Sequence, residues 1–84
     1  MYYVTMNDIY KSYWGLSKDK INKLIFECAT REDAEYIINY VKNNRPEMKY
    51  IYVCRKKPTY RKKKYYVQYI NKYQFINWRK GCEK

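Results

Sequence analysis

The chain has 84 residues, with 19 Lys or Arg, 8 Asp or Glu and no histidine, giving a formal net charge of +11 at pH 7. This length provides one small domain with a single core, and a hydrophobic content of 46% is too high for a disordered basic tail. No apolar run approaches the roughly 20 residues of a membrane span, and no secretory signal follows Met1, so we expect a cytoplasmic protein that does not contact a membrane.

The charge is unevenly distributed along the chain. Residues 1–47 contain seven Lys or Arg and seven Asp or Glu, whereas residues 48–84 contain twelve Lys or Arg and a single acid, Glu83. The whole net positive charge therefore belongs to the second half. Such a distribution gives the electrostatic field a direction, which guides anionic partners to one face.

The first predicted element is a strand at Tyr2–Met6, because this stretch is rich in aromatic and β-branched residues. A long connection follows at residues 7–20 and contains Trp14 beside Gly15. Trp14 has two interpretations, an exposed stacking platform or a plug that closes one end of the core. We favour the plug, because large aromatic side chains contribute most when buried.

A second strand is predicted at Ile21–Ala29, where Leu24, Phe26 and Cys28 alternate onto one face. Thr30 then begins an amphipathic helix as its N-cap, with acidic residues in the first turn. Its apolar stripe recurs at helical spacing over Ala34, Ile37, Ile38 and Val41. Pro46 ends the helix after Asn43-Asn44, where we expect an asparagine in a left-handed cap.

The second half predicts a strand at Lys49–Arg55, a basic loop at Arg55–Lys64 and a strand at Tyr65–Ile70. The tail at residues 71–84 predicts a short turn or helix that packs on the sheet edge and frays at Gly81. The fold class is thus α+β, one domain over residues 1–84 with the order β-β-α-β-β, one helix on an antiparallel or mixed sheet. If the last two strands form a hairpin, the basic loop is its tip. One helix covers one sheet face, so the other face should expose tyrosines and allow a homodimer.

The basic loop is the candidate nucleic-acid site. Such a density of cations cannot be buried unpaired, so the loop must be solvated. Its side chains suit contact with the phosphates of DNA or RNA, and the alternative is a solvated, self-repelling loop without a partner. The candidate phosphate contacts are Arg55, Lys56, Lys57, Arg61, Lys62, Lys63 and Lys64.

Tyrosines beside the loop are candidates for base stacking, which needs only an exposed ring. Tyr60 lies within the loop and would stack or brace it, and Tyr50, Tyr52 and Tyr66 lie on the neighbouring strands. The alternative explanation of the 13 tyrosines is strand propensity together with the codon usage of an AT-rich genome.

Catalysis is disfavoured, because the chain has no histidine for acid–base work and no phosphate-binding glycine loop. Three scattered cysteines, Cys28, Cys54 and Cys82, form neither a disulfide framework nor a metal motif. We interpret Cys28 and Cys54 as small apolar strand residues in a reducing compartment. The sequence therefore indicates no enzyme, no metal and no cofactor.

Most of the chain resembles small uncharacterised proteins of phages, plasmids and conjugative elements of low-GC Gram-positive bacteria. The matching pieces are Tyr2–Met6, Trp14-Gly15, Lys20–Cys28, Met48–Tyr60 and Lys64–Tyr69, and the chain departs in its basic run at 61–64 and its longer aromatic tail. The resemblance implies a mobile-element origin and transfers no catalytic residue. It also implies a second function class beside a nucleic-acid-binding accessory protein. This class is an inhibitor of host defence, similar to anti-CRISPR proteins, that binds an effector protein or nucleoprotein.

Overall fold

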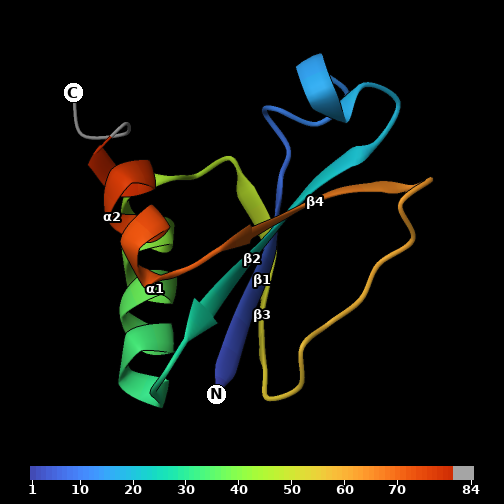
Figure 1. Cartoon of the computed structure of the whole chain (residues 1–84). Helices are drawn as coiled ribbons and strands as arrows, with labels where there is room; N and C mark the ends of the chain where they lie inside the picture. The colour runs from blue at the N-terminus through green and yellow to red at the C-terminus, as the bar shows by residue number, and fades with distance from the viewer. Residues whose placement is uncertain (81–84) are drawn as a thin grey trace.

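The computed structural model describes residues 1–80 and contains a four-stranded mixed sheet with two helices packed on one face (Figure 1). The order of elements confirms the α+β class predicted from the sequence. The elements are β1 (Tyr2–Asp8), a 3-10 turn η1 (Gly15–Ser17), β2 (Ile21–Cys28), α1 (Arg31–Asn44), β3 (Met48–Cys54), β4 (Tyr65–Ile70) and α2 (Lys72–Lys80).

The strands are arranged in the order β3-β1-β2-β4. β1 pairs antiparallel with both β2 and β3, whereas β4 adds parallel to the free edge of β2. β3 and β4 therefore lie at opposite edges of the sheet and run in the same direction. The expected β3–β4 hairpin is wrong, and residues 55–64 instead cross from one edge of the sheet to the other.

One sheet face and the stripe of α1 form the core. Val4, Met6, Leu24 and Phe26 are fully or almost fully buried beneath Ala34, Ile37 and Val41, which confirms the predicted faces of β2 and of the helix. The Thr30 hydroxyl accepts a hydrogen bond from the Asp33 amide at 3.2 Å, as the capping pattern predicts.

The C-terminal end of α1 differs from its prediction. The helix ends at Asn44, and the amide of the extended residue Arg45 donates to the Val41 carbonyl at 2.7 Å. Neither Asn43 nor Asn44 has a positive φ, so the expected left-handed asparagine cap is wrong. Pro46 alone accounts for the stop, because it cannot continue a helix.

α2 confirms the short C-terminal helix that the sequence predicted as one of two possibilities for the tail. The Phe75 and Trp78 rings both meet the Phe26 ring edge to face, with centroid distances of 5.8 and 5.2 Å. Tyr40 of α1 packs against Phe75 at 5.9 Å, so α2 bridges α1 and the sheet. The fraying expected at Gly81 lies outside the described residues.

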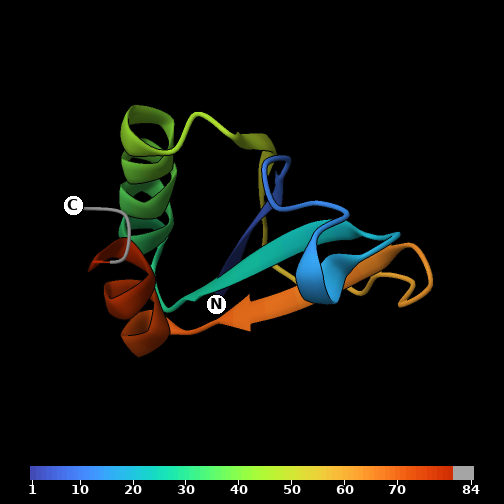
Figure 2. The same ribbon diagram turned by 90° about the horizontal axis from the view of Figure 1, so that it is seen from above.

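The second sheet face is partly covered by the basic loop, which lies on the side opposite the helices (Figures 1 and 2). Thr5, Lys23 and Ile25 point to this face and are only 3%, 6% and 0% exposed. Tyr52 and Tyr69 remain exposed there, as the sequence predicted for this face. The prediction of a tyrosine-rich face is thus confirmed at its margins, while its centre is buried.

Candidate nucleic-acid interface

The basic loop runs back along the whole length of the sheet. The Lys57 ammonium lies 4.6 Å above the ring of Tyr69, near the end of β4, and the Tyr69 hydroxyl donates to the Pro58 carbonyl at 3.3 Å. At the other end, the Lys64 carbonyl accepts a hydrogen bond from the Ile21 amide at 2.9 Å. The four-residue step from Tyr69 to Tyr65 corresponds to about 13 Å.

The seven candidate cations therefore form two groups and not one tip. We call Arg55, Lys56 and Lys57 the upstream group, and Arg61, Lys62, Lys63 and Lys64 the downstream group. All seven residues are exposed, which confirms the prediction of a solvated loop. Among the described residues, the ion pairs are Arg31–Glu35 and the two pairs of Arg45, and none involves either group.

A turn holds the downstream group in place. The amides of Lys64 and Tyr65 both donate to the Arg61 carbonyl, at 3.1 and 2.9 Å. This turn leads directly into β4, so the four cations are fixed to the end of a sheet strand. Because the turn restrains the backbone that carries these cations, binding phosphates costs less backbone entropy than it would on a free chain.

Tyr60 braces the loop. Its half-buried ring lies 5.1 Å from the Tyr65 ring, and the Lys23 ammonium lies 4.8 Å above it. Lys23 is only 6% exposed, and burial lowers the pKa of its amine. Of the two roles expected for Tyr60, bracing is the one that these contacts support.

The other predicted stacking residues lie in different places. Tyr50 and Tyr52 are 62% and 63% exposed but belong to β3, the edge strand farthest from β4. Tyr66 is half-buried on β4, directly after the downstream group. The structure thus brings Tyr66 to the downstream group and separates Tyr50 and Tyr52 from it.

Sequence reasoning placed Trp14 wrongly. Its side chain is 75% exposed, so it does not plug the core, and Tyr10, Tyr13 and Leu16 of the same connection are 76%, 60% and 80% exposed. Polar contacts hold the connection: the Ser12 hydroxyl accepts from the Asn22 amide at 3.1 Å, and the Ser17 hydroxyl donates to the Lys11 and Trp14 carbonyls. The sequence feature that could have indicated this exposed aromatic surface is the density of aromatic residues around Gly15.

This aromatic connection lies at the same end of the sheet as the downstream group. The Tyr13 amide donates to the Lys20 carbonyl, and the next residue, Ile21, donates to Lys64. η1 contacts β4 and lies beside it in Figure 2. One end of the molecule therefore combines four fixed cations with exposed aromatic rings.

A hollow of about 280 Å³ follows the outer edge of β4 at this end. Lys20 and Lys62 line it together with the rings of Tyr60, Tyr65 and Tyr66. Ammonium groups beside aromatic rings can meet a phosphate and a base at the same time.

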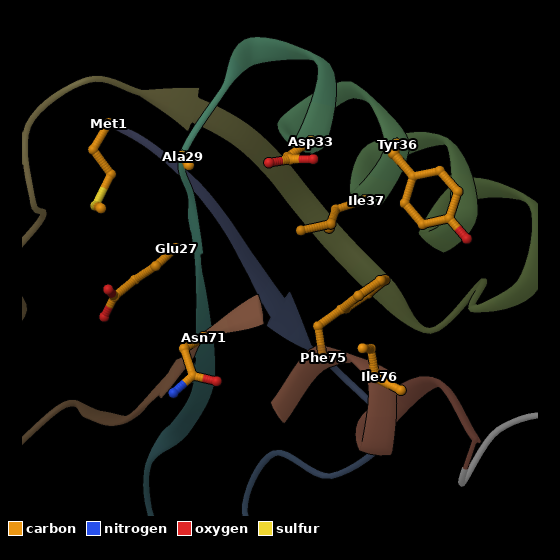
Figure 3. Close-up of a pocket in the computed structure, with 9 residues that line it drawn as sticks. All are labelled: Met1, Glu27, Ala29, Asp33, Tyr36, Ile37, Asn71, Phe75 and Ile76. Carbon is orange, nitrogen blue, oxygen red and sulfur yellow. The ribbon is translucent and has the colours of Figure 1, made fainter. Parts of the chain in front are cut away.

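A larger pocket of about 430 Å³ between α1, α2 and β2 has the opposite character (Figure 3). Ile37, Tyr36 and Phe75 form an apolar wall, and the carboxylates of Glu27 and Asp33 also line the pocket. Two acids repel phosphate, so this pocket does not suit a polyanion.

The described residues contain no group of three or more His, Cys, Asp or Glu side chains that could hold a metal. Burial, helped by the charge of Asp33, raises the pKa of the Cys28 thiol to about 11, which keeps it protonated and unreactive at neutral pH. Cys54 is half-buried, with its sulfur 3.7 Å from the Tyr3 carbonyl. Both cysteines are strand residues, as predicted.

Comparisons of the chain with protein-family models, with curated proteins and with solved structures found no match in any of the three. Within residues 1–80, no helix has the length and apolar character needed to cross a membrane.

Proposed function

We propose that this protein is a non-enzymatic nucleic-acid-binding accessory protein of a phage or mobile element, and that the downstream group is its main phosphate contact. The observation that carries the proposal is the turn at Arg61–Lys64, which fixes four exposed cations beside the rings of the 9–20 connection. The absence of histidine and of a glycine-rich phosphate loop from the sequence supports a binding role.

The energetic argument rests on counterion release. Each cation that meets a phosphate frees a condensed counterion, so affinity falls steeply as salt rises. The four cations of the downstream group have no carboxylate partner among the described residues, so binding breaks no ion pair. Lys57 of the upstream group lies about 13 Å away along β4, above the Tyr69 ring, and gives the same strand a second contact. Arg55 lies instead above the Tyr2 ring of β1.

The test is fluorescence anisotropy of labelled single- and double-stranded oligonucleotides at several salt concentrations. We expect a log–log salt slope of roughly −4 to −6, which corresponds to about that many phosphate contacts. The double variant Lys62→Gln/Lys63→Gln should reduce the magnitude of the slope by about 1.4 to 1.8, because it removes two contacts.

A matched control removes the same charge from another face. Arg31→Gln/Lys42→Gln lowers the net charge equally, but both residues are exposed on α1, away from the downstream group at the start of β4. It should leave the slope nearly unchanged. Equal losses in the two variants would contradict a specific site and indicate only a general effect of net charge.

No binding of any oligonucleotide at low salt would overturn the proposal. The basic face would then point to an acidic protein or a nucleoprotein, as for an inhibitor of host defence. A pull-down against such effector complexes would be the next measurement.

A further inference from the structure

A second hollow, of about 230 Å³, lies between the 9–20 connection and β4. Trp14 and Leu16 line it from the connection, Asn22 from β2, and Tyr66 and Gln68 from β4. It is smaller than the roughly 300–1,000 Å³ of ordinary small-molecule pockets. Its size suits a single flat ring that is carried by a larger molecule.

Two amides form the polar part of this hollow. The Gln68 Nε2 donates to the Asn22 Oδ1 at 2.7 Å, and Asn22 is only 3% exposed. The structure gives the Asn22 Nδ2 and the Gln68 Oε1 no hydrogen-bond partner among the described residues. If both amides were flipped, the pair would still present one free donor and one free acceptor. Adjacent donor and acceptor groups are what the Watson–Crick edge of an unpaired base requires.

The aromatic residues supply the stacking surface. Trp14 is 75% exposed, although its backbone is held by hydrogen bonds from its amide to Lys11 and from the Ser17 hydroxyl to its carbonyl. An exposed indole on a fixed backbone loses little freedom when a ring stacks on it. Tyr66 lines both this hollow and the one that contains Lys20 and Lys62. Asn22 and Gln68 lie on the sheet face of Leu24, so a strand would reach from one hollow to the other around the edge strand β4.

We infer that the hollow at Trp14, Asn22, Tyr66 and Gln68 binds one unpaired base of a single-stranded nucleic acid, while the neighbouring cations contact its phosphates. The inference rests on the proposed function and extends it, because it selects single strands over duplex. A base paired within a duplex cannot offer its Watson–Crick edge to the two amides. Lys11 at the rim adds a further cation for the strand.

The experiment separates base contacts from phosphate contacts with two probes. One is a labelled twelve-residue oligothymidylate, and the other is an abasic strand of equal length with the same phosphates. We expect the protein to bind the oligothymidylate about tenfold more tightly than the abasic strand. One base stacked on an aromatic side chain contributes about 1–3 kcal/mol to binding, and about 1.4 kcal/mol corresponds to a tenfold change in affinity.

Three variants assign the preference to the hollow. Trp14→Ala should remove most of the preference for the strand with bases and leave the affinity for the abasic strand unchanged. Trp14→Phe should restore much of the preference, because phenylalanine also stacks. Tyr10→Ala is the matched control, since Tyr10 is 76% exposed on the same connection and does not line the hollow. It should behave like the unaltered protein.

The outcomes distinguish this inference from the function on which it rests. Equal affinity of the unaltered protein for both strands would overturn the base-binding hollow and leave phosphate binding intact. Binding of neither strand at low salt would overturn both. An equal loss of affinity for both strands in Trp14→Ala would show that Trp14 shapes the connection without contacting a base, and would also overturn the inference.

Discussion

Arg45 is a mostly buried cation with acid partners, in contrast to the exposed cations of the basic loop. Its guanidinium, with a side chain only 13% exposed, forms ion pairs with Asp8 and Glu47 and lies 4.4 Å above the Trp78 ring. The Asp8 carboxylate also accepts from the Lys11 amide at 3.0 Å. One arginine therefore links the end of β1, the start of β3 and α2. The seven cations of the basic loop have no acid partner of this kind among the described residues.

The pair between Arg45 and Glu47 predicts a specific acid sensitivity. Burial alone would raise the pKa of Glu47, but the hydrogen bond and charge of Arg45, a backbone hydrogen bond and the charge of Lys11 together lower it below its ordinary 4.5. A carboxylate with a lowered folded-state pKa contributes stability above its unfolded value, and this contribution is lost as the pH falls through the folded value.

The Glu47→Gln variant should therefore be less stable than the unaltered protein at pH 7, by about 0.5–1 kcal/mol for a partly exposed pair. The difference should disappear as the pH falls below 4.5 and through the lowered pKa of Glu47 in the folded protein. Thermal unfolding of both proteins across this range measures it. A difference that stays constant with pH would show that the glutamine disturbs packing and not charge.

At the scale of elements, α2 depends for its stability on tertiary contacts with α1 and the sheet. A helix of nine residues is not stable alone in water, so its side chains must stabilise it through tertiary contacts. Phe75, at 7% exposure, meets the rings of Phe26 and Tyr40 and stacks on Trp78 at 5.9 Å. This cluster closes the core beside the last residues of β4.

Phe75→Ala should accordingly lower the free energy of unfolding by about 3–5 kcal/mol, since it leaves a cavity among the four rings that Phe75 contacts. Urea denaturation followed by circular dichroism measures the change. Tyr73→Ala is the control on the same helix, because Tyr73 is 78% exposed and its loss should cost less than about 0.5 kcal/mol. Similar costs for the two variants would contradict the docked position of α2.

The elements themselves were predictable because their signals are local. The Thr30 cap, the stripe on α1 and the alternation in β2 each lie within a few residues of one another. Strand order is not a local property. YYVQYI has apolar and aromatic residues on both faces, so it fits equally well beside β3 or beside β2. The ten-residue connection contains no two-residue turn signal such as Asn-Gly that would have imposed or excluded a hairpin.

Of the candidate nucleic-acid site, only the cations could be predicted from the sequence. Charge density alone shows that the basic loop is exposed, whereas the exposure of Trp14 depends on what its connection packs against. Serine hydroxyls hold that connection by bonding backbone groups, and this leaves the aromatic side chains unused in the core. The amide pair of Asn22 and Gln68 joins residues 46 positions apart, so no local pattern could indicate it.

At the scale of the whole molecule, the sheet separates two electrostatic sides. The helix side carries Glu32, Asp33 and Glu35 at the start of α1, and the opposite side carries the basic loop (Figure 2). The molecule measures 34 × 33 × 20 Å, and even its shortest extent is longer than the Debye length of about 8 Å at physiological salt, so the charges of one side are largely screened from the other. A polyanion is therefore attracted to the loop side and the β4 edge, and not to the helices.

The path of the basic loop leaves it little slack. Cys54 is level with Tyr3 and Glu27, and Tyr65 is level with Ile21. The connection thus covers about 20 Å along the strands and about 14 Å across them, or about 25 Å in a straight line. Because residues 61–64 form a turn, most of this span falls to the seven steps from Cys54 to Arg61, which reach about 23–25 Å when extended.

Removing Lys57, Pro58 and Thr59 would leave eight steps from Cys54 to Tyr65, which reach about 26–29 Å only when fully extended. The turn at Arg61–Lys64 should therefore open, and the urea midpoint should fall. Inserting three glycines at the same place should change the stability by less than about 0.6 kcal/mol. The unchanged midpoint of the shortened protein would contradict the crossing path. The basic loop is thus only just long enough for its path, and the sheet sets the distance between Lys57 at the Tyr69 ring and the turn at Arg61–Lys64. A polyanion that contacts both is expected to present phosphates at a matching distance.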